Sequence, residues 1–203
     1  MRIAVLGTGT VGRTLAAKLR DVGHDVTVGS RTAKEDARPF EEAAAGAELI
    51  VNATNGEASL DALAQAGADN LRGKIVVDVA NTLDFSRGRP PRLSVCNDDS
   101  LGEQIQRAHP DARVVKTLNT VNASVMVDPS LVPGSHTVFV SGDDAAAKEE
   151  VARLLESFGW ARGQIVDLGD ITSARGAEMY VALWLRLMGV TESSQFNIHV
   201  VKG

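Results

Sequence analysis

The sequence predicts an α/β fold with a doubly wound, mostly parallel sheet, and three observations support this prediction. Short apolar runs of strand type alternate along the chain with longer stretches of helical spacing. A glycine-rich turn at 7–12 separates the first apolar run from the first helical stretch. The chain has 203 residues, of which 44% are hydrophobic, so it is long enough to bury a sizeable core.

The N-terminal segment has the order strand, glycine-rich turn, helix. Residues 2–6 form an apolar run, and 13–19 has its apolar side chains on one helical stripe. Between them lies a G-x-G-x-x-G pattern made of Gly7, Thr8, Gly9, Thr10, Val11 and Gly12. In this context the first glycine permits a tight turn, the second admits a pyrophosphate, and the third lets the helix pack close to the strand. We therefore predict a Rossmann-type dinucleotide-binding loop, in preference to a glycine-rich turn with no ligand.

The end of the second strand indicates which dinucleotide binds. That strand is predicted at 25–28 and is followed by Gly29, Ser30, Arg31 and Thr32. An NAD site usually has an acidic residue here, which accepts a hydrogen bond from the ribose 2′-hydroxyl. A guanidinium between two hydroxyls instead suits a 2′-phosphate. We therefore predict NADP(H) rather than NAD(H); the alternative is a surface turn that contains an arginine, close to Glu35 and Asp36.

The remaining elements continue the alternation. Strands are predicted at 48–52, 74–79, 113–118, 137–141 and 164–168, with a candidate terminal strand at 196–201. Helices are predicted at 59–66, 143–158 and 170–188, and a capping box at 100–103 opens another helix that stops at Pro110. We expect residues 1–142 to form the NADP-binding domain. Residues 143–203 are then a small appendage of helix and strand packed on it, at the acceptor site or at a dimer contact.

Small residues follow three of these strands, where ligands bind in open α/β sheets. They are Asn52, Ala53 and Thr54; then Ala80 and Asn81; and then Asn119 and Thr120. Neutral amides and hydroxyls suit a nicotinamide ribose and carboxamide, and the alanines leave room for them; ordinary turn chemistry is the alternative. The sequence has no nucleophile signature, so the chemistry belongs mainly to the cofactor. Asn119 and Thr120 are the candidate catalytic residues, which orient the nicotinamide or its acceptor.

The segment 84–93 is rich in proline and glycine and carries Arg87, Arg89 and Arg92. It follows the strand at 74–79, so it is expected near the mouth of the cofactor cleft. One hypothesis is a lid whose arginines attract an anionic hydride acceptor. A solvated loop is the other.

Composition restricts the classes of partner. The formal net charge is −5 without a polybasic block, which argues against nucleic acids and anionic membranes. The single cysteine, Cys96, excludes an internal disulfide and is typical of a reducing compartment. The N-terminus does not resemble a signal peptide, and the apolar stretch 179–190 is too short to span a membrane, so we expect a cytoplasmic protein. The four histidines lack metal-ligand spacing, and no metal is expected.

The chain resembles the family of NADPH-dependent coenzyme F420 reductases over nearly its whole length. The motifs that carry the resemblance are 7–12, 28–31, 115–120, 141–144 and the segment 167–178. The resemblance implies that 7–12 binds phosphate and that Ser30, Arg31 and Thr32 form the 2′-phosphate site. Where archaeal F420 reductases carry a His and a Pro beside the deazaflavin, this chain has Asn119 and Asn122. The same fold is similar to the cytosolic domain of membrane metalloreductases, whose acceptor is a flavin.

The implied function is hydride transfer between NADP(H) and a second ring cofactor or small acceptor, with F420 or FMN/FAD as possible acceptors. The last helix, with Met179, Tyr180, Leu183 and Trp184, is expected to close the acceptor site, to form a homodimer contact or to belong to the core. A non-catalytic NADP(H)-binding sensor or regulatory protein is the alternative function.

Overall fold

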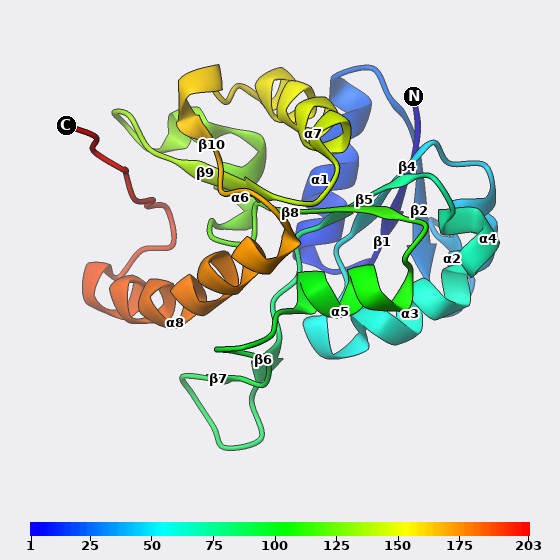
Figure 1. Cartoon of the computed structure of the whole chain (residues 1–203), viewed down its shortest axis with the longest axis horizontal. Helices are drawn as coiled ribbons and strands as arrows, with labels where there is room; N and C mark the ends of the chain where they lie inside the picture. The colour runs from blue at the N-terminus through cyan, green and yellow to red at the C-terminus, as the bar shows by residue number, and fades with distance from the viewer.

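An eight-stranded sheet runs through the computed structural model, which describes all residues from 1 to 203 (Figure 1). The strand order is β10 (Ile165–Asp167), β9 (Val138–Ser141), β8 (Arg113–Thr117), β5 (Ile75–Asp78), β4 (Leu49–Asn52), β1 (Arg2–Leu6), β2 (Asp25–Ser30) and β3 (Arg38–Pro39). All neighbours pair in parallel except β8 and β9, which are antiparallel. The predicted doubly wound, mostly parallel sheet is therefore confirmed.

Helices cover both faces of this sheet, because its central strands are apolar on both sides. One face packs against α1 (Thr10–Asp21), α6 (Ala123–Val127) and α7 (Ala145–Phe158), through one apolar cluster. The other packs against α2 (Phe40–Ala45), α3 (Ser59–Ala66), α4 (Ala68–Leu71) and α5 (Leu101–Ala108), through a second cluster. In Figure 1, α7 lies above the sheet and α3 and α5 lie below it. Val11, Leu15, Ala16 and Leu19 of α1 all face the first cluster, as their spacing predicts.

The C-terminal part, residues 143–203, adds one strand to the same sheet. It contributes α7, β10 and α8 (Ala174–Thr191), and α8 contacts α5 and the edge of the hairpin described next. Asp170 caps the 3-10 turn at 171–173 that leads into α8, so this long helix begins four residues later than predicted and continues to Thr191. No helix combines the length and apolar character needed to cross a bilayer.

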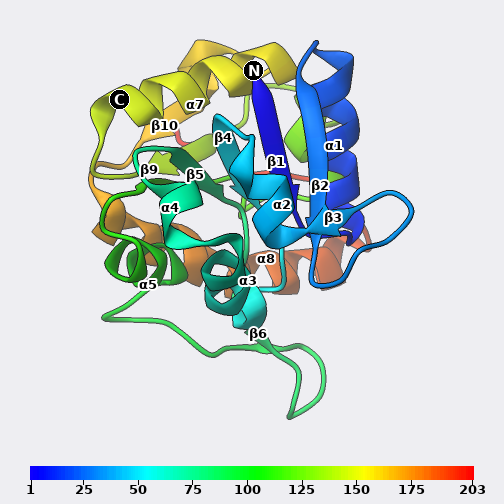
Figure 2. The ribbon, with the colours of Figure 1, turned by 90° about the vertical axis from the view of Figure 1, so that its right-hand side faces the viewer.

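A short antiparallel hairpin projects from the molecule. Its strands are β6 (Leu83–Asp84) and β7 (Arg92–Leu93), and the loop between them extends away from the sheet in both views (Figures 1 and 2). The sequence predicts only a long connection here, because two-residue strands carry no detectable alternation.

The predicted terminal strand at 196–201 is wrong. Residues 195–203 form no regular structure, although this segment lies beside Thr137. One backbone bond joins Thr137 N–H to Ile198 O at 2.8 Å, and the other contacts come from side chains: Asn197 Nδ2 donates to Thr137 O, and Val200 N–H donates to Thr137 Oγ1. A single backbone bond does not make a ladder.

Candidate functional site

The glycine turn has the geometry that the dinucleotide pattern requires. Gly7 has a φ of +125°, and a Cβ there would lie 2.4 Å from Ala53 O. A Cβ on Gly12 would lie 2.1 Å from Gly7 O, so α1 packs directly on the turn. Gly9 differs, because a Cβ there would meet no atom of the chain within 4 Å. Gly9 is also the N-cap of α1 and provides no side-chain cap, which leaves N–H groups of the first turn available to a phosphate.

A polar cavity of about 540 Å³ opens beside this turn. Its walls include Gly7, Thr8, Gly9, Ser30, Arg31, Thr32, Lys34, Ala53, Thr54 and Asn55, together with Phe40, Ala58, Asp61, Ala62 and Gln65. Arg31 is exposed and forms no ion pair, so its guanidinium is free to bind an anion. The Ser30 hydroxyl donates to Thr32 O, which holds the turn around the arginine. These residues fit a dinucleotide that carries a 2′-phosphate.

Sequence reasoning missed Lys34 as a second cation of this cavity. Lys34 Nζ lies 3.3 Å from Thr8 Oγ1 and thus reaches from the loop after β2 to the phosphate-binding turn. Two basic residues three apart after a second strand are the signal that could have found it, but Glu35 and Asp36 follow directly and obscure that signal.

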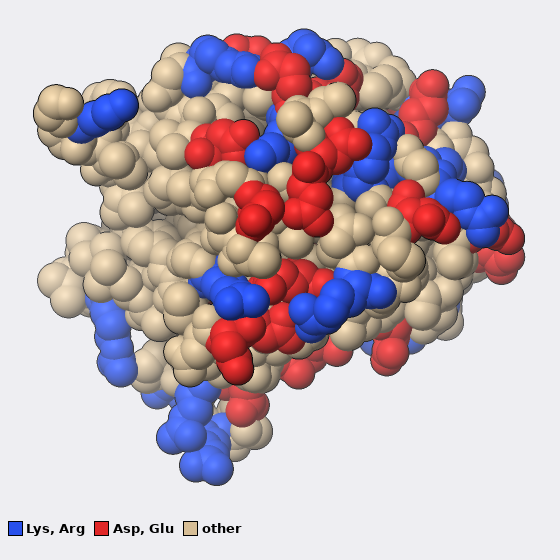
Figure 3. Space-filling view, viewed as in Figure 1, with Lys and Arg blue, Asp and Glu red and all other residues tan.

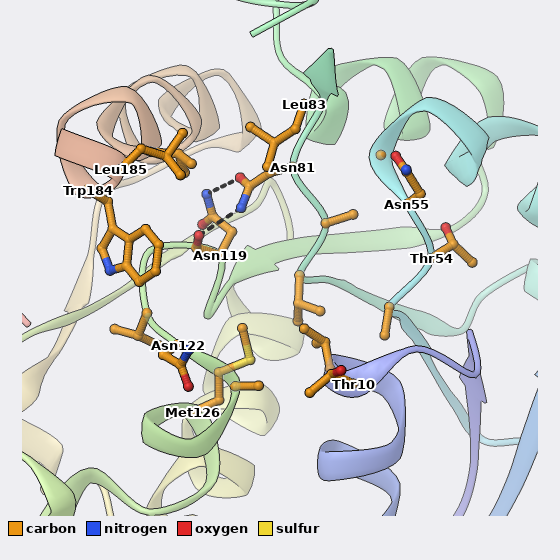
Figure 4. Close-up of a pocket in the computed structure, with 18 of the residues that line it drawn as sticks. Thr10, Thr54, Asn55, Asn81, Leu83, Asn119, Asn122, Met126, Trp184 and Leu185 are labelled. Carbon is orange, nitrogen blue, oxygen red and sulfur yellow. Dashed lines mark hydrogen bonds between the residues drawn. The ribbon is translucent and has the colours of Figure 1, made fainter. Parts of the chain in front are cut away.

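A second cavity, of about 420 Å³, shares the wall formed by Ala53, Thr54 and Asn55 with the first (Figure 4). It is lined by Thr10, Val11, Ala53, Thr54, Asn55, Gly56, Val79, Ala80, Asn81, Leu83, Phe85, Asn119, Val121, Asn122, Ala123, Met126, Val181, Trp184 and Leu185. None of these side chains titrates. We call it the neutral cavity, and the first one the polar cavity. In Figure 4, Trp184 and Leu185 of α8 lie on one side and Thr10 and Thr54 on the other.

Two asparagines at the carboxyl ends of neighbouring strands form the central polar contact of the neutral cavity. Asn81 Nδ2 donates to Asn119 O at 2.9 Å, and Asn119 Nδ2 donates to Asn81 Oδ1 at 3.0 Å (Figure 4). Asn119 Nδ2 also donates to Ala177 O of α8 at 3.0 Å. Leu118, just before, has a φ of +60°, which turns the chain sharply out of β8. The pair therefore fixes the distance between the ends of β5, β8 and α8.

The structure brings most of the predicted site residues to the two cavities. The polar cavity includes Gly7, Thr8, Gly9, Ser30, Arg31 and Thr32. The neutral cavity includes Thr10, Val11, Ala80, Asn81 and Asn119, and Ala53 and Thr54 belong to both. Their contact with a ligand stays a prediction.

Three predicted residues line neither cavity. Gly12 lies beneath the turn, against Gly7. Asn52 is fully buried, because its Nδ2 donates to Asp78 Oδ1 at 2.8 Å and to Ser59 Oγ at 2.9 Å. Thr120 is 2% exposed. Asn52 therefore joins β4 to β5 through Asp78, and contact of Asn52 or Thr120 with a ligand stays a prediction.

A buried ion cluster underlies the neutral cavity and was not predicted. Lys116 Nζ lies 2.7 Å from Asp78 Oδ2 and 2.9 Å from Glu178 Oε1, with all three side chains essentially inaccessible. It also donates to Ala80 O at 2.5 Å. Burial alone lowers the pKa of Lys116, but the charges of Asp78 and Glu178 outweigh it and raise this pKa, so the ammonium stays charged. A lysine inside an apolar strand was the available signal.

Glu178 extends this cluster to a helix. Its carboxylate accepts hydrogen bonds from Leu101 N–H at 2.8 Å and Gly102 N–H at 3.1 Å, at the N-terminus of α5. The lysine, the two carboxylates and the helix end thus lock α8 against β5 and β8. Elsewhere, the side chains include no group of three His, Cys, Asp or Glu placed to hold a metal ion.

Comparisons with known proteins agree with this geometry. The family model described as NADP oxidoreductase, coenzyme F420-dependent, matches residues 2–82. The crystal structure of a candidate F420-dependent NADP reductase from Arthrobacter sp. FB24 is 54% identical, with a TM-score of 0.95 over 100% of both chains. The F420-dependent NADP reductase of Methanothermobacter marburgensis is 28% identical over 92% of both chains. Metalloreductase STEAP3 of Rattus norvegicus is 32% identical over 92% of this chain, which spans 37% of that relative's length.

Proposed function

Because the chain belongs to the family of F420-dependent NADP oxidoreductases and is an NADP-dependent oxidoreductase, we propose that it transfers a hydride from NADPH to a flavin or a deazaflavin. The observation that carries this choice of acceptor is the neutral cavity, which adjoins the polar cavity and contains no titratable side chain.

The two cavities have different roles in the proposed reaction. In the polar cavity, the N–H groups at the start of α1 and the guanidinium of Arg31 would hold the phosphates of NADPH. The shared wall at 53–55 leads into the neutral cavity, where Ala53 and Ala80 present little bulk and Asn81 and Asn119 present amides. Bound NADPH supplies the hydride. The residues supply position and exclude water.

The absence of titratable side chains from the lining of the neutral cavity selects among acceptors. Hydride transfer to an imine or a carbonyl places negative charge on one nitrogen or oxygen, which calls for a proton donor at that atom. A conjugated ring spreads the charge and takes its proton from solvent after the transfer. The overall reaction is NADPH, oxidised ring and one proton giving NADP⁺ and reduced ring. Trp184, Phe85 and Met126 offer flat or polarisable surfaces for such a ring.

The test follows NADPH oxidation at 340 nm with FMN, FAD, riboflavin, coenzyme F420, quinones, and small imines and carbonyls. We expect turnover with at least one flavin or deazaflavin and none with imines or carbonyls. Turnover confined to imines or carbonyls would contradict the ring acceptor. Tight NADPH binding without turnover of any acceptor would favour a sensor instead.

A further inference from the structure

We propose that the β6–β7 hairpin is an anion-binding arm, which holds the phosphate-bearing tail of the ring whose flat part enters the neutral cavity. This inference rests on the proposed function, since it names the class of acceptor further: a planar ring with a phosphate ester tail. We call residues 83–93 the arm.

The arm begins inside the site and ends outside it. Leu83 and Phe85, at its base, line the neutral cavity, and β7 contacts α8, which forms one wall of that cavity. Phe85 is 47% exposed although it lines a cavity, so its ring stands at the mouth. From there the loop projects into solvent (Figures 1 and 2). A ligand that leaves the cavity past Phe85 therefore meets the arm.

The arm carries three arginines that form no ion pair. Arg87, Arg89 and Arg92 are exposed, and none lies within 4.0 Å of a carboxylate, whereas six other arginines form ion pairs. Figure 3 shows basic side chains gathered at the lower tip of the molecule. In a chain with a net charge of −5, this gathering of positive charge attracts anions.

Phe85 lies between the arginines of the arm and the mouth of the neutral cavity. The guanidinium of Arg89 lies 5.5 Å from the centroid of the Phe85 ring, a cation–π contact. Asp84 stands opposite Arg92 in the hairpin, but its carboxylate accepts from Ser86 N–H at 2.7 Å and Ser86 Oγ at 2.9 Å. These bonds to Ser86, reinforced by Arg87 and Arg92, lower the pKa of Asp84. Asp84 therefore forms its hydrogen bonds within the turn, and no guanidinium of the arm lies within ion-pair distance of it.

The neutral cavity explains why a tail needs the arm. Its lining has no cation, so a phosphate group cannot be accommodated there. The polar cavity has cations, but in the proposed function these cations bind the 2′-phosphate and diphosphate of NADPH. The arm provides guanidiniums beside the mouth, and guanidinium binds phosphate in a bidentate manner.

Two ligand pairs that share a ring and differ in the tail test this inference by binding alone. Riboflavin is compared with FMN, and the phosphate-free deazaflavin fragment with coenzyme F420. Affinities are measured by ring fluorescence with saturating NADP⁺, which donates no hydride. We expect the phosphorylated member of at least one pair to bind about 10-fold or more tightly, the scale of charged hydrogen bonds. This preference should weaken at high salt.

The variant Arg87→Gln, Arg89→Gln, Arg92→Gln should reduce the preference to about one while the affinity for the phosphate-free member is retained. The matching lysine variant should keep most of it. The control is Arg72→Gln, Arg153→Gln, Arg162→Gln, which removes three exposed charges elsewhere and should leave the preference intact.

The outcomes separate this inference from the proposed function. Three outcomes would refute the anion-binding role of the arm. They are equal binding within both pairs, no binding of any of the four ligands, and an undiminished preference in the glutamine variant. Turnover in which neither the flavin pair nor the deazaflavin pair differs in KM between its members would also refute the arm's role while the reductase stands. A phosphate preference that depends on the arginines, without NADPH turnover, would support the arm and refute the reductase.

Discussion

At the scale of single residues, Arg31 is the side chain that we expect to distinguish NADPH from NADH. It is exposed, lacks an ion pair and lines the polar cavity. We predict that Arg31→Ala weakens NADPH binding by about 1–3 kcal/mol, the range for a charged hydrogen bond, and leaves NADH nearly unchanged. Titration calorimetry with both nucleotides measures this. Equal weakening of the two would show that Arg31 does not contact the 2′-phosphate.

Lys116 is the residue on which we expect stability to depend most. Its removal leaves Asp78 and Glu178 buried next to each other without a cation. We predict that Lys116→Met lowers the free energy of unfolding by about 3–5 kcal/mol, read from the urea midpoint. The variant Asp78→Asn, Lys116→Met, Glu178→Gln removes all three charges and should recover part of the loss. A loss below about 1 kcal/mol in the single variant would contradict the buried ion cluster.

At the scale of elements, Glu103 and Arg175 join α5 to α8. Arg175 Nε and Nη2 lie 2.8 and 2.5 Å from the Glu103 carboxylate. The hydrogen bonds from Arg175 outweigh burial and hold the pKa of Glu103 below its ordinary value of 4.5. Since the folded-state pKa is the lower one, the stabilisation is complete above pH 4.5. It is lost as the pH falls through the folded-state value.

We therefore predict that Glu103→Gln lowers the Tm at pH 7 and that the difference from wild type shrinks as the pH falls below 4.5. Arg175 is 36% exposed, so we expect about 1 kcal/mol, or about 2–4 °C. Melting curves from pH 7 to 3.5 test this. Glu150→Gln, in an exposed pair with Arg153, should have almost no effect at any pH. A difference that is constant over the range would contradict the pKa argument.

The elements that the sequence predicts well are those whose signals are local. The turn at 7–12 and the strand before it depend on adjacent residues, and the cap of α5 by Ser100 needs only the spacing to Glu103. The helices α2 and α6 were missed because six and five residues are too few to show a helical period. The terminal strand was predicted from alternating apolar residues, but side-chain contacts, with one backbone bond, hold that segment.

At the scale of the whole molecule, the site joins segments that lie far apart in the chain. The neutral cavity is lined by residues from 53–56, 79–85, 119–126 and 181–185. Below it lies Lys116, whose partners Asp78 and Glu178 are 38 and 62 positions away from it in the sequence. The residue types at strand ends predicted Asn81 and Asn119. Trp184 was named from the apolar character of the last helix as one of the residues that could close the acceptor site, and it lines the neutral cavity. No local pattern predicts the role of Glu178, because that role arises only when α8 packs on the sheet.

This interlocking predicts how the molecule responds to its cofactor. β10 belongs to the same sheet as strands of residues 1–142, and α8 contributes to the ion cluster and to the neutral cavity. We therefore expect one cooperative unfolding transition. NADP⁺ at about 100 times its Kd should stabilise the folded state by about 2.7 kcal/mol and raise the Tm by about 5–10 °C. NAD⁺ at the same concentration should raise it far less, because it lacks the 2′-phosphate. Scanning calorimetry measures both shifts.

Two separate transitions, of which NADP⁺ shifts only one, would mean that residues 143–203 unfold independently. Equal shifts with NADP⁺ and NAD⁺ would mean that Arg31 and Lys34 do not select the cofactor.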